Sequence, residues 1–289
     1  MSNTIELAKS FVPKLDECYR LASLTSVLDG APELAKQGAN ANELIIPMMS
    51  MDGLADYSRN GGYVQGGVTM TNETVKCNFD RGRRFDVDVM DDLETAGLAF
   101  GRLSAQFIRD KVVPELDAFR FASYCGISGV TKKEETLADG AATVAALSAA
   151  VTAMDDEEVT ATGRYLFITP TLLQGINDMD TTKSKKVLEG FEQVIKVPQR
   201  RFYTAIKQLS GKTGEEAGGY TKATGAANIN FAIVQKDALI QYTKHAAPKI
   251  IAPENNPDAD AYVFGYRMVG IAKAYKNMPS GMYFSHDKA

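Results

Sequence analysis

Two strand-like segments of the sequence are separated by a glycine-rich loop that is much too long for a compact hairpin turn. Residues 43–51 are rich in strand-forming side chains, and residues 68–79 alternate between apolar and polar side chains. The loop between them, residues 52–67, far exceeds the usual hairpin turn of about two to five residues. A two-stranded hairpin is at best marginally stable alone in water. We therefore expect this one to lie against another surface, in the same chain or in a second subunit.

The longest helical pattern begins after residues 91–92, two aspartates that suit a helix N-terminus. Apolar side chains then recur at spacings of three and four residues as far as Tyr124, beginning with Leu93, Ala96, Phe100, Leu103 and Phe107. A helix of about 30 to 35 residues is on the order of 50 Å long, and we expect a kink at Pro114. Such a rod is predicted to span the molecule.

A shorter amphipathic helix is predicted near the N-terminus, over residues 14–28, and it ends at Asp29-Gly30. Residues 38–42 beyond it are typical of a loop. Because the helix has one apolar stripe, it must dock elsewhere, on this chain or on a neighbour. The stripe consists of Cys18, Leu21, Leu24 and Leu28.

Helical and strand patterns alternate in the second half of the chain, which predicts a mixed α/β domain. An amphipathic helix is predicted from Asp139, whose side chain suits an N-cap, to Met154. Residues 250–269 are predicted as two strands joined by an acidic, proline-containing loop. The other predicted elements are strands at 164–170, 191–197, 202–206, 230–234 and 282–284, a short helix at 171–176, and a polar glycine-containing loop at 211–225.

Charge and cysteine content narrow the possible roles. Lys and Arg total 32 against 36 Asp and Glu, a formal net charge of −4, so general affinity for nucleic acid is not predicted. Cys18, Cys77 and Cys125 are odd in number and far apart, which favours reduced thiols over disulfides or a zinc site. The N-terminus lacks a signal-peptide pattern. The longest apolar stretch, residues 141–154, is shorter than the roughly 20 residues that span a bilayer, and no membrane association is expected.

No catalytic, cofactor-binding or metal site is predicted. Ser210-Gly-Lys-Thr-Gly214 is similar to the end of a phosphate-binding loop, but the motif needs a glycine where Ile206 stands. His245 and His286 lack a second ligand type at zinc-like spacing. One acidic segment could hold a divalent cation, although a strand followed by a helix start explains its carboxylates without one; they belong to Asp86, Asp88, Asp91 and Asp92.

Five segments carry a resemblance to a known family. They are Gly53-Leu-Ala-Asp-Tyr-Ser-Arg-Asn-Gly-Gly-Tyr63, Asp80-Arg-Gly-Arg-Arg-Phe-Asp-Val-Asp88, Val113-Pro-Glu-Leu-Asp-Ala-Phe-Arg-Phe121, Arg164-Tyr-Leu-Phe-Ile-Thr-Pro170 and Ala252-Pro-Glu-Asn-Asn-Pro-Asp-Ala-Asp-Ala261. They run in order through most of the chain. Together they resemble the tailed-bacteriophage major capsid protein of the Hong Kong 97-like fold, an α+β class.

The resemblance implies a division of the chain into parts with different roles. An N-terminal arm precedes an extended β-hairpin loop. A peripheral domain with a long spine helix packs beside an α/β axial domain, to which the C-terminus returns. The implied parts are the arm at 1–42, the extended loop at 43–79, the peripheral domain at 80–127, the axial domain at 128–247, the peripheral strands and acidic loop at 248–272, and the C-terminal return at 273–289.

The function that the resemblance implies is structural, with no enzyme activity and no cofactor. The chain would self-assemble into pentamers and hexamers of an icosahedral shell, which encloses double-stranded DNA without sequence-specific binding. The shell would be part of the virion and assemble in the host bacterial cytoplasm, where scaffolding, portal and head-decoration proteins are potential partners. The same fold also forms encapsulin compartments, which are the alternative function. An enzyme with an unrecognised site has only the incomplete motif at residues 210–214 in its favour.

The resemblance also places three groups of side chains at contacts between subunits. Copies of the acidic loop would meet at three-fold positions, where each pair of like charges about 6 Å apart costs roughly 2 to 3 kcal/mol. Arginines of a neighbour, or a bound cation, are expected to offset that cost. The three groups are Tyr57, Arg59 and Tyr63 at the loop tip, Arg81, Arg83 and Arg84 after the loop, and Glu254, Asp258 and Asp260 in the acidic loop.

The isopeptide linkage known for this fold is not expected. It joins a lysine of the extended loop to an asparagine of a neighbour. Asn255 and Asn256 lie in a suitable loop, but the hairpin tip carries Arg59 and no lysine, and Lys76 lies toward the base.

Overall fold

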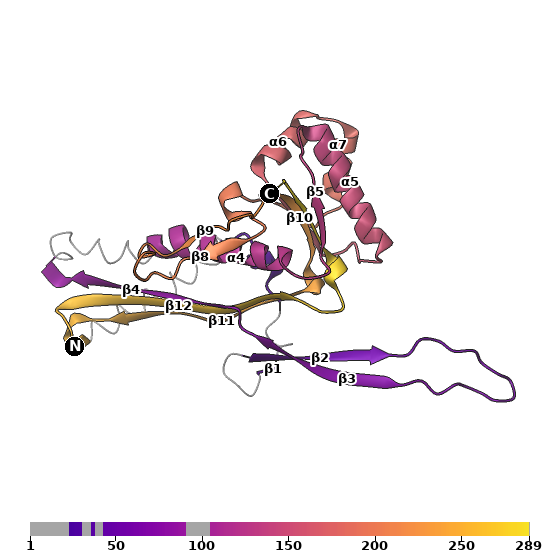
Figure 1. The fold of residues 1–289 in the computed structure, drawn as a ribbon, viewed down its shortest axis with the longest axis horizontal. Coiled ribbons are helices and arrows are strands. Elements are labelled where there is room, and N and C mark those ends of the chain that lie inside the picture. The colour runs from indigo at the N-terminus through magenta and orange to yellow at the C-terminus, as the bar shows by residue number, and fades with distance from the viewer. Residues whose placement is uncertain (1–22, 31–35, 38–42, 91–104, 289) are drawn as a thin grey trace.

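The computed structural model describes residues 23–30, 36–37, 43–90 and 105–288. These residues form helices together with a five-stranded sheet, two three-stranded sheets and a two-stranded ribbon (Figure 1). One of the three-stranded sheets contains a hairpin that projects from the rest of the molecule. The mixed α+β class predicted from the sequence is confirmed.

The five-stranded sheet has the order β5-β13-β10-β6-β7. Its central strand, β10, is buried along its whole length, because helices α5 to α7 cover one face and α4 (Val113–Cys125) lies against the other. Phe231 and Ile233 point toward the first group of helices, and Ala232 and Val234 belong to the opposite core. The bounds are β5 Thr131–Glu134, β6 Arg164–Ile168, β7 Gln193–Lys196, β10 Ile229–Gln235, β13 Met282–His286, α5 Gly140–Asp156, α6 Pro170–Asp178 and α7 Thr182–Glu189.

The elongated sheet has the antiparallel order β11-β12-β4, formed by Leu239–Ile251, Ala261–Ala274 and Phe79–Asp88. Pairing of the first two strands runs from Leu239 opposite Ala274 to Ile251 opposite Val263. The late strands are thus longer than the sequence predicted, and β11 begins within the segment assigned to the axial domain. The segment that follows the extended loop, residues 80–88, lies in the edge strand β4, which pairs with β12.

The spine helix is described from residue 105, and its last part, α4, spans Val113–Cys125. Residues 91–104 lie outside the described part, so the predicted start and full length remain predictions. A π-helical segment, Ile108–Val112, ends two residues before Pro114, where the sequence predicted a kink. Proline cannot donate a backbone hydrogen bond and its ring crowds the carbonyl of the preceding turn. A wider turn accommodates both effects.

Helix α4 joins two hydrophobic cores. Val113 and Leu116 pack against the elongated sheet, and Phe121 and Tyr124 pack beneath the five-stranded sheet. The half-buried Phe119 contacts both cores. The predicted spanning role of this helix is therefore confirmed for its described part.

The projecting hairpin consists of β2, Glu43–Met51, and β3, Val68–Lys76. Their register runs from Glu43 opposite Lys76 to Met51 opposite Val68. The long hairpin predicted from the sequence is therefore confirmed. A two-residue strand, β1 (Lys36–Gln37), pairs with the base of β2. The segment 68–79 is not one strand but two, because pairing with β2 ends at Lys76 and β4 begins at Phe79. Between them, Asn78 exchanges hydrogen bonds of 2.9 and 3.0 Å with the backbone of Ala272 and joins the hairpin to β12.

Several other sequence predictions need correction. The strand predicted at residues 202–206 is wrong for residues 202–205, which follow a 3-10 turn, Gln199–Arg201, and make one bridge from Tyr203 to Asn228; a strand begins only at Ile206. The polar loop that follows is part of a small hairpin of β8, Ile206–Gln208, and β9, Tyr220–Lys222. The sequence prediction also missed β5 and α7, because both have few apolar side chains. Helix α7 does begin with a capping box from Thr181 and Ser184.

Other predictions at the helix and strand ends are confirmed within the described part. Asp139 caps α5 by accepting a hydrogen bond from the backbone of Ala142 at 2.8 Å. Of the predicted N-terminal helix, only the end is described; Ser26–Leu28 form a 3-10 turn and Leu28 is buried. Cys18 and Leu21 lie outside the described residues. The remaining short turns are 3-10 helices at Lys236–Ala238, Pro253–Asn255 and Pro279–Gly281.

Candidate functional site

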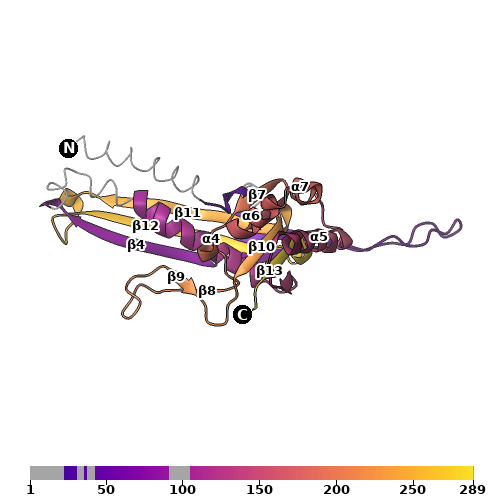
Figure 2. The same ribbon diagram turned by 90° about the horizontal axis from the view of Figure 1, so that it is seen from above.

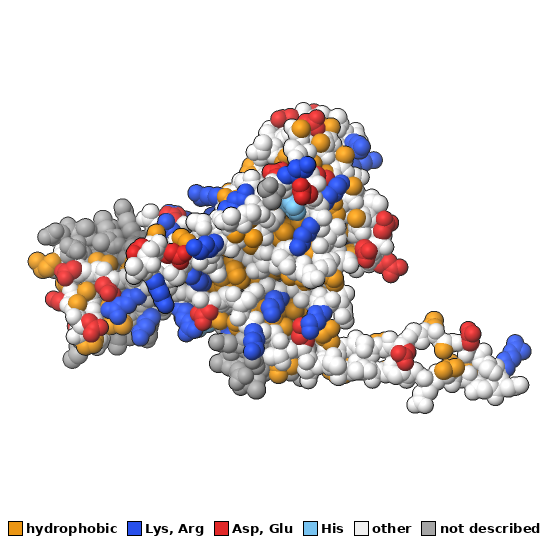
Figure 3. Space-filling view, in the orientation of Figure 1, with side chains coloured by type: hydrophobic (Ala, Val, Ile, Leu, Met, Phe, Trp, Pro, Cys, Tyr) orange, Lys and Arg blue, Asp and Glu red, His pale blue; other side chains and the backbone are white. Residues whose placement is uncertain are grey.

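The outer part of the projecting hairpin exposes an unusual number of large apolar side chains. In the described part of the chain, most exposed large hydrophobic residues lie on it, and they include Met49, Met51, Leu54, Tyr57, Tyr63, Val64, Val68 and Met70. Figure 3 shows the hairpin standing away from the body with hydrophobic side chains along it. A soluble monomer rarely exposes such a concentration, which marks a surface for interaction.

Four of these side chains form one face of the ribbon, which we call the methionine face: Met49, Met51, Val68 and Met70. Met49 lies opposite Met70, and Met51 lies opposite Val68, so the four side chains share a side. They are 56 to 67% exposed. Val75 of the same strand has the opposite parity and is buried against Ile240 and Ile271 at the base. The face that seats the hairpin on its own chain is therefore not the methionine face.

The hairpin tip is closed by local hydrogen bonds. The Asp52 carboxylate accepts from the backbone N–H of Gly67 at 2.7 Å, and a tight turn at the end pairs Ser58 with Gly62. The rings of Tyr57 and Tyr63 lie 4.9 Å apart and tilted, although both side chains are largely exposed. The structure thus brings together the two tyrosines predicted at subunit contacts, and Arg59 is exposed between them at the turn.

The predicted arginine group divides into two environments. Arg84 is exposed and forms an ion pair of 2.8 Å with Asp86 on the same strand. Together with the nearby carboxylate of Asp258, Asp86 raises the pKa of the Arg84 guanidinium. Arg84 and the acidic loop of one chain therefore already lie close together. Whether they also contact a second subunit stays a prediction.

Arg81 and Arg83 instead contact their own chain. Arg81 forms an ion pair of 2.8 Å with Glu115 of α4, and it donates 2.7 Å to the carbonyl of Leu209. Arg83 donates 2.8 Å to the carbonyl of Glu216. These partners could not be predicted from the sequence, because residues 209–219 are far away along the chain. Their predicted role between subunits remains a prediction.

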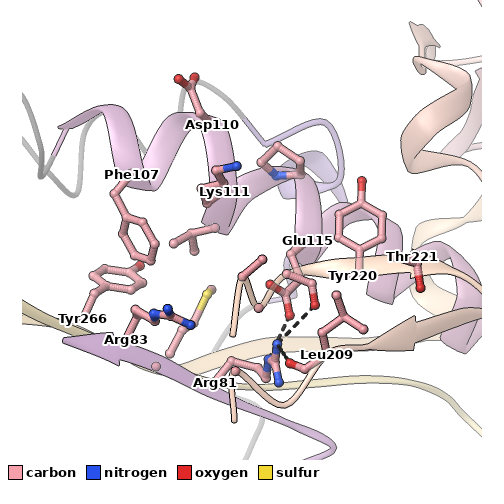
Figure 4. A pocket seen from close by; sticks show the side chains of 18 of the residues that line it. Arg81, Arg83, Phe107, Asp110, Lys111, Glu115, Leu209, Tyr220, Thr221 and Tyr266 are labelled. Carbon is pink, nitrogen blue, oxygen red and sulfur yellow. Dashed lines mark hydrogen bonds and ion pairs between the residues drawn. The ribbon is translucent and has the colours of Figure 1, made fainter. Parts of the chain in front are cut away.

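These contacts lie in a groove of about 750 Å³ between α4, the elongated sheet and the β8–β9 hairpin. Phe107 and Tyr266 provide aromatic walls, and Figure 4 shows Arg81 directed at Glu115 and Leu209. Gln208 also donates to Glu115, at 3.4 Å. The one buried carboxylate of the groove is thus engaged by groups of the same chain.

The acidic loop is ordered by its own side chains. Asn256 donates 3.0 Å to the carbonyl of Ala261 and accepts from the backbone N–H of Asp258. Glu254, Asp258 and Asp260 are all exposed. The loop therefore presents its three carboxylates outward. The carboxylates at residues 86–92, which the sequence explained without a cation, are only partly described, since Asp91 and Asp92 lie outside the described residues.

A buried polar network that the sequence analysis missed anchors residues 23–29, the described end of the predicted N-terminal helix. Asp117 of α4 is fully buried and accepts from Ser23, Thr25 and the backbone N–H of Leu24, at 2.7 to 3.3 Å. The Arg201 guanidinium lies 3.2 Å from the same carboxylate. The available signal was a group of charged residues, Glu115, Asp117 and Arg120, among the apolar side chains of one helix, because buried charges are kept only with partners.

The same network extends to the elongated sheet. Arg120 is 2% exposed and donates to Thr25, Asp29 and Thr243 at 2.9 to 3.3 Å. The Tyr124 hydroxyl donates to Gln241, and burial raises the pKa of this tyrosine above its usual range. Residues 23–29, α4 and β11 are therefore held at one junction.

Other candidate chemistry finds little support. In the part of the chain that the structure describes, no cluster of His, Cys, Asp and Glu is arranged to hold a metal ion. Across the same residues, no helix is long and apolar enough to cross a membrane. Cys77 and Cys125 are free thiols, and burial raises the pKa of both. Cys18 lies outside the described residues.

Comparison with known proteins gives a consistent result at the level of the fold. No protein-family model matches the sequence, and no curated protein matches it significantly. Among solved structures, the virus-like particle from Pyrococcus furiosus matches with a TM-score of 0.60 and 10% identity, covering 96% of this chain and 98% of that one. The capsid of the cyanophage P-SCSP1u matches with a TM-score of 0.55 and 13% identity, over 87% and 85%. The mature capsid of bacteriophage PhiM1 gives 0.52 and 9%, over 85% and 82%.

The chain has the fold of phage capsid proteins. The likeness covers 85% or more of this chain in each of these matches. It therefore extends over the five-stranded sheet, the elongated sheet and α4, and is not confined to one of them. The structures that it resembles are a particle and capsids, whereas the failed nucleotide motif was the only sign of an enzyme.

Proposed function

We propose that this chain is the major capsid protein of a tailed bacteriophage and builds a closed shell from many copies of itself. The observation that carries the proposal is the methionine face on a hairpin that stands clear of its own chain. Burying each such side chain contributes roughly 1.5 to 3 kcal/mol before the costs of ordering and desolvation. A second copy of the chain can supply the surface that covers it.

The finer arrangement follows the Hong Kong 97-like plan. Residues 128–247 form the axial domain at the centre of pentamers and hexamers. The hairpin lies across the neighbouring peripheral domain, and the acidic loops meet at three-fold positions. The shell is part of the virion, assembles in the host cytoplasm and encloses double-stranded DNA. Scaffolding, portal and head-decoration proteins are its partners. The capsid fold and the exposed hairpin support this arrangement, because both require neighbours.

The test uses two faces of one strand. Val68→Lys with Met70→Lys puts two charges on the methionine face. Thr69→Lys with Thr71→Lys puts the same charges on the other face, where both threonines are exposed. We expect the first variant to stay as soluble subunits and the second to form shells, in sedimentation and electron microscopy. Circular dichroism should show both variants folded.

The outcomes separate the possible errors. If the Val68 and Met70 variant forms shells as the natural chain does, the methionine face is not a subunit contact. If only the threonine variant fails, the contact is on the other side of the hairpin. A natural chain that remains monomeric at all concentrations would contradict the shell function.

An encapsulin-like compartment is the second candidate, and the match to the archaeal virus-like particle favours it specifically. Both functions predict closed particles, so the contents decide between them. Nuclease-treated particles that retain double-stranded DNA indicate a capsid. Particles that carry a co-purified enzyme and no genome indicate a compartment.

Shells should be held together without covalent linkage between subunits. The hairpin tip has no lysine, and Asn256 is engaged within its own loop. Boiled particles should run as one band of monomer size in denaturing gels. A ladder of larger bands would contradict this expectation.

A further inference from the structure

The glycine-rich loop of the β8–β9 hairpin turns its carbonyl groups toward the elongated sheet. The carbonyls of Leu209 and Gly219 accept from Arg81 at 2.7 and 3.3 Å, and that of Glu216 accepts from Arg83 at 2.8 Å. A phosphate-binding loop presents N–H groups to its ligand. This loop instead presents carbonyl groups, which accept hydrogen bonds from the guanidinium groups of Arg81 and Arg83 in the same chain.

Two glycines of the loop lie against the end of the Arg83 side chain. A Cβ on Gly211 would lie 2.9 Å from the Arg83 guanidinium, and one on Gly218 would lie 3.0 Å from it. Both glycines also have positive φ values, +72° and +63°. The positive φ values favour glycine at both positions, and a Cβ at either one would force the Arg83 guanidinium to shift from its observed place.

Arg81 fastens the same loop to a third element. Besides its two carbonyl partners, it pairs with Glu115, which is 8% exposed on α4. One side chain of β4 thus joins the loop to the spine helix. Removing Arg81 from this ion pair is costly, because the largely buried carboxylate of Glu115 would then lack a countercharge.

The roots of the hairpin lie in the other core. Phe202, just before β8, is fully buried beneath the five-stranded sheet. The backbone N–H of Ala227, after β9, donates 2.8 Å to the Thr204 hydroxyl. Figure 2 shows the hairpin running from this region beside α4 and β4. It connects the two cores separately from α4 and β11, and we call it the strap.

We propose that Arg81 and Arg83 are positioning residues that act through the strap. They hold the five-stranded sheet at a set angle to the elongated sheet, and that angle sets the curvature of the shell. The inference rests on the proposed shell function. In a closed shell, the angle between the two sheets of each subunit sets the angle at which its neighbours meet. A subunit in which the angle between the sheets varies would therefore form shells of several sizes.

The first test displaces Arg83 without removing it. Gly211→Ala places a methyl group against the flexible end of Arg83. Gly214→Ala is the matched control, because Gly214 has a φ of +89° and open space around its Cβ position. We expect amide exchange over residues 206–222 to be about tenfold faster in Gly211→Ala than in the control, the effect of losing one charged hydrogen bond. Exchange is measured on soluble subunits.

The second test removes the charge. Arg83→Met is compared with Lys212→Met, which removes the same charge from the exposed end of the strap. We expect Arg83→Met particles to show a broad range of diameters by electron microscopy and Lys212→Met particles to keep the natural diameter. A general loss of stability would lower the yield of particles without changing their size.

Each result bears on a different part of the proposal. Equal exchange in Gly211→Ala and Gly214→Ala would show that Arg83 does not fasten the strap. Faster exchange with unchanged diameters would overturn the link to curvature. If the natural chain formed no particles, the shell function would fail while the exchange result still decided whether the strap is fastened.

Discussion

The two protruding hairpins of this molecule differ in where their binding partners are. Both are two-stranded ribbons with long glycine-rich ends, at residues 52–67 and 209–219. The β8–β9 hairpin ends on arginines of its own chain. The β2–β3 hairpin ends in exposed tyrosines and carries the methionine face, with contacts to its own chain near the base. The first braces a subunit, whereas the second requires another subunit.

The largest expected effect comes from shortening the β2–β3 hairpin. Deleting residues 54–66 leaves the Asp52 and Gly67 backbone groups close enough to form a short turn. We expect soluble subunits or incomplete assemblies in place of shells, because the surface that reaches a neighbour is gone. Size-exclusion chromatography and electron microscopy measure the result. Removing residues 212–217 from the strap should instead leave closed particles of variable size. If the two deletions had equal effects, the β2–β3 hairpin and the strap would not have different roles.

The next effect concerns the root of the strap. Asp117→Ala should lower the free energy of unfolding by about 3 to 5 kcal/mol, because Arg201 and its neighbours then remain buried without a countercharge. Asp110→Ala on the same helix is the control; its exposed carboxylate pairs with the adjacent Arg109, and its loss should cost less than about 1 kcal/mol. Chemical denaturation of subunits gives both values. Similar values for the two variants would mean that the network does not anchor the strap.

A smaller effect is expected at the acidic loop between β11 and β12. Asp258→Asn with Asp260→Asn should change subunit stability by less than about 0.5 kcal/mol, since both side chains are exposed. Shell disassembly should nevertheless become less sensitive to salt, because charges that meet between copies are removed. Light scattering across a salt series measures this. Unchanged disassembly at every salt concentration would show no assembly role, and chelator sensitivity of natural shells would indicate a cation.

The smallest effect is a titration within the strap. Lys207 and Ser210 lower the pKa of Glu215 to about 2, from an ordinary value of 4.5. Because the pKa of Glu215 is lowered in the folded chain, the contribution of its ionised carboxylate to stability is present above pH 4.5. That contribution is lost as the pH falls toward 2. In Lys207→Met the pKa should return toward 4.5, followed by NMR of the Glu215 side chain. If the pKa stays near 2, the Lys207 contact does not set it.

Regular elements were predictable where periodicity was strong. The strand-forming residues 43–51 and the alternation in residues 68–79 predicted the hairpin, and Asp139 marked the start of α5, because these signals are local. Helix α7 and strand β5 were missed, since Lys-rich sequences such as Thr131–Glu134 give no apolar pattern. Residues 202–206 have a strand-like composition, but Phe202 is apolar because it fills a core beneath another sheet.

The sequence by itself determined the long loop, the class of fold and the absence of a complete nucleotide motif, because these depend on neighbouring residues. Only the tertiary structure decided which arginines remain available to a neighbour. Arg81, Arg83 and Arg84 are alike in sequence, yet two of them bind carbonyls near residues 209–219 and the third pairs with Asp86. Likewise, the methionine face exists only because the register places Met49 opposite Met70. Distant partners and cross-strand register arise from chain folding, and no local pattern encodes them.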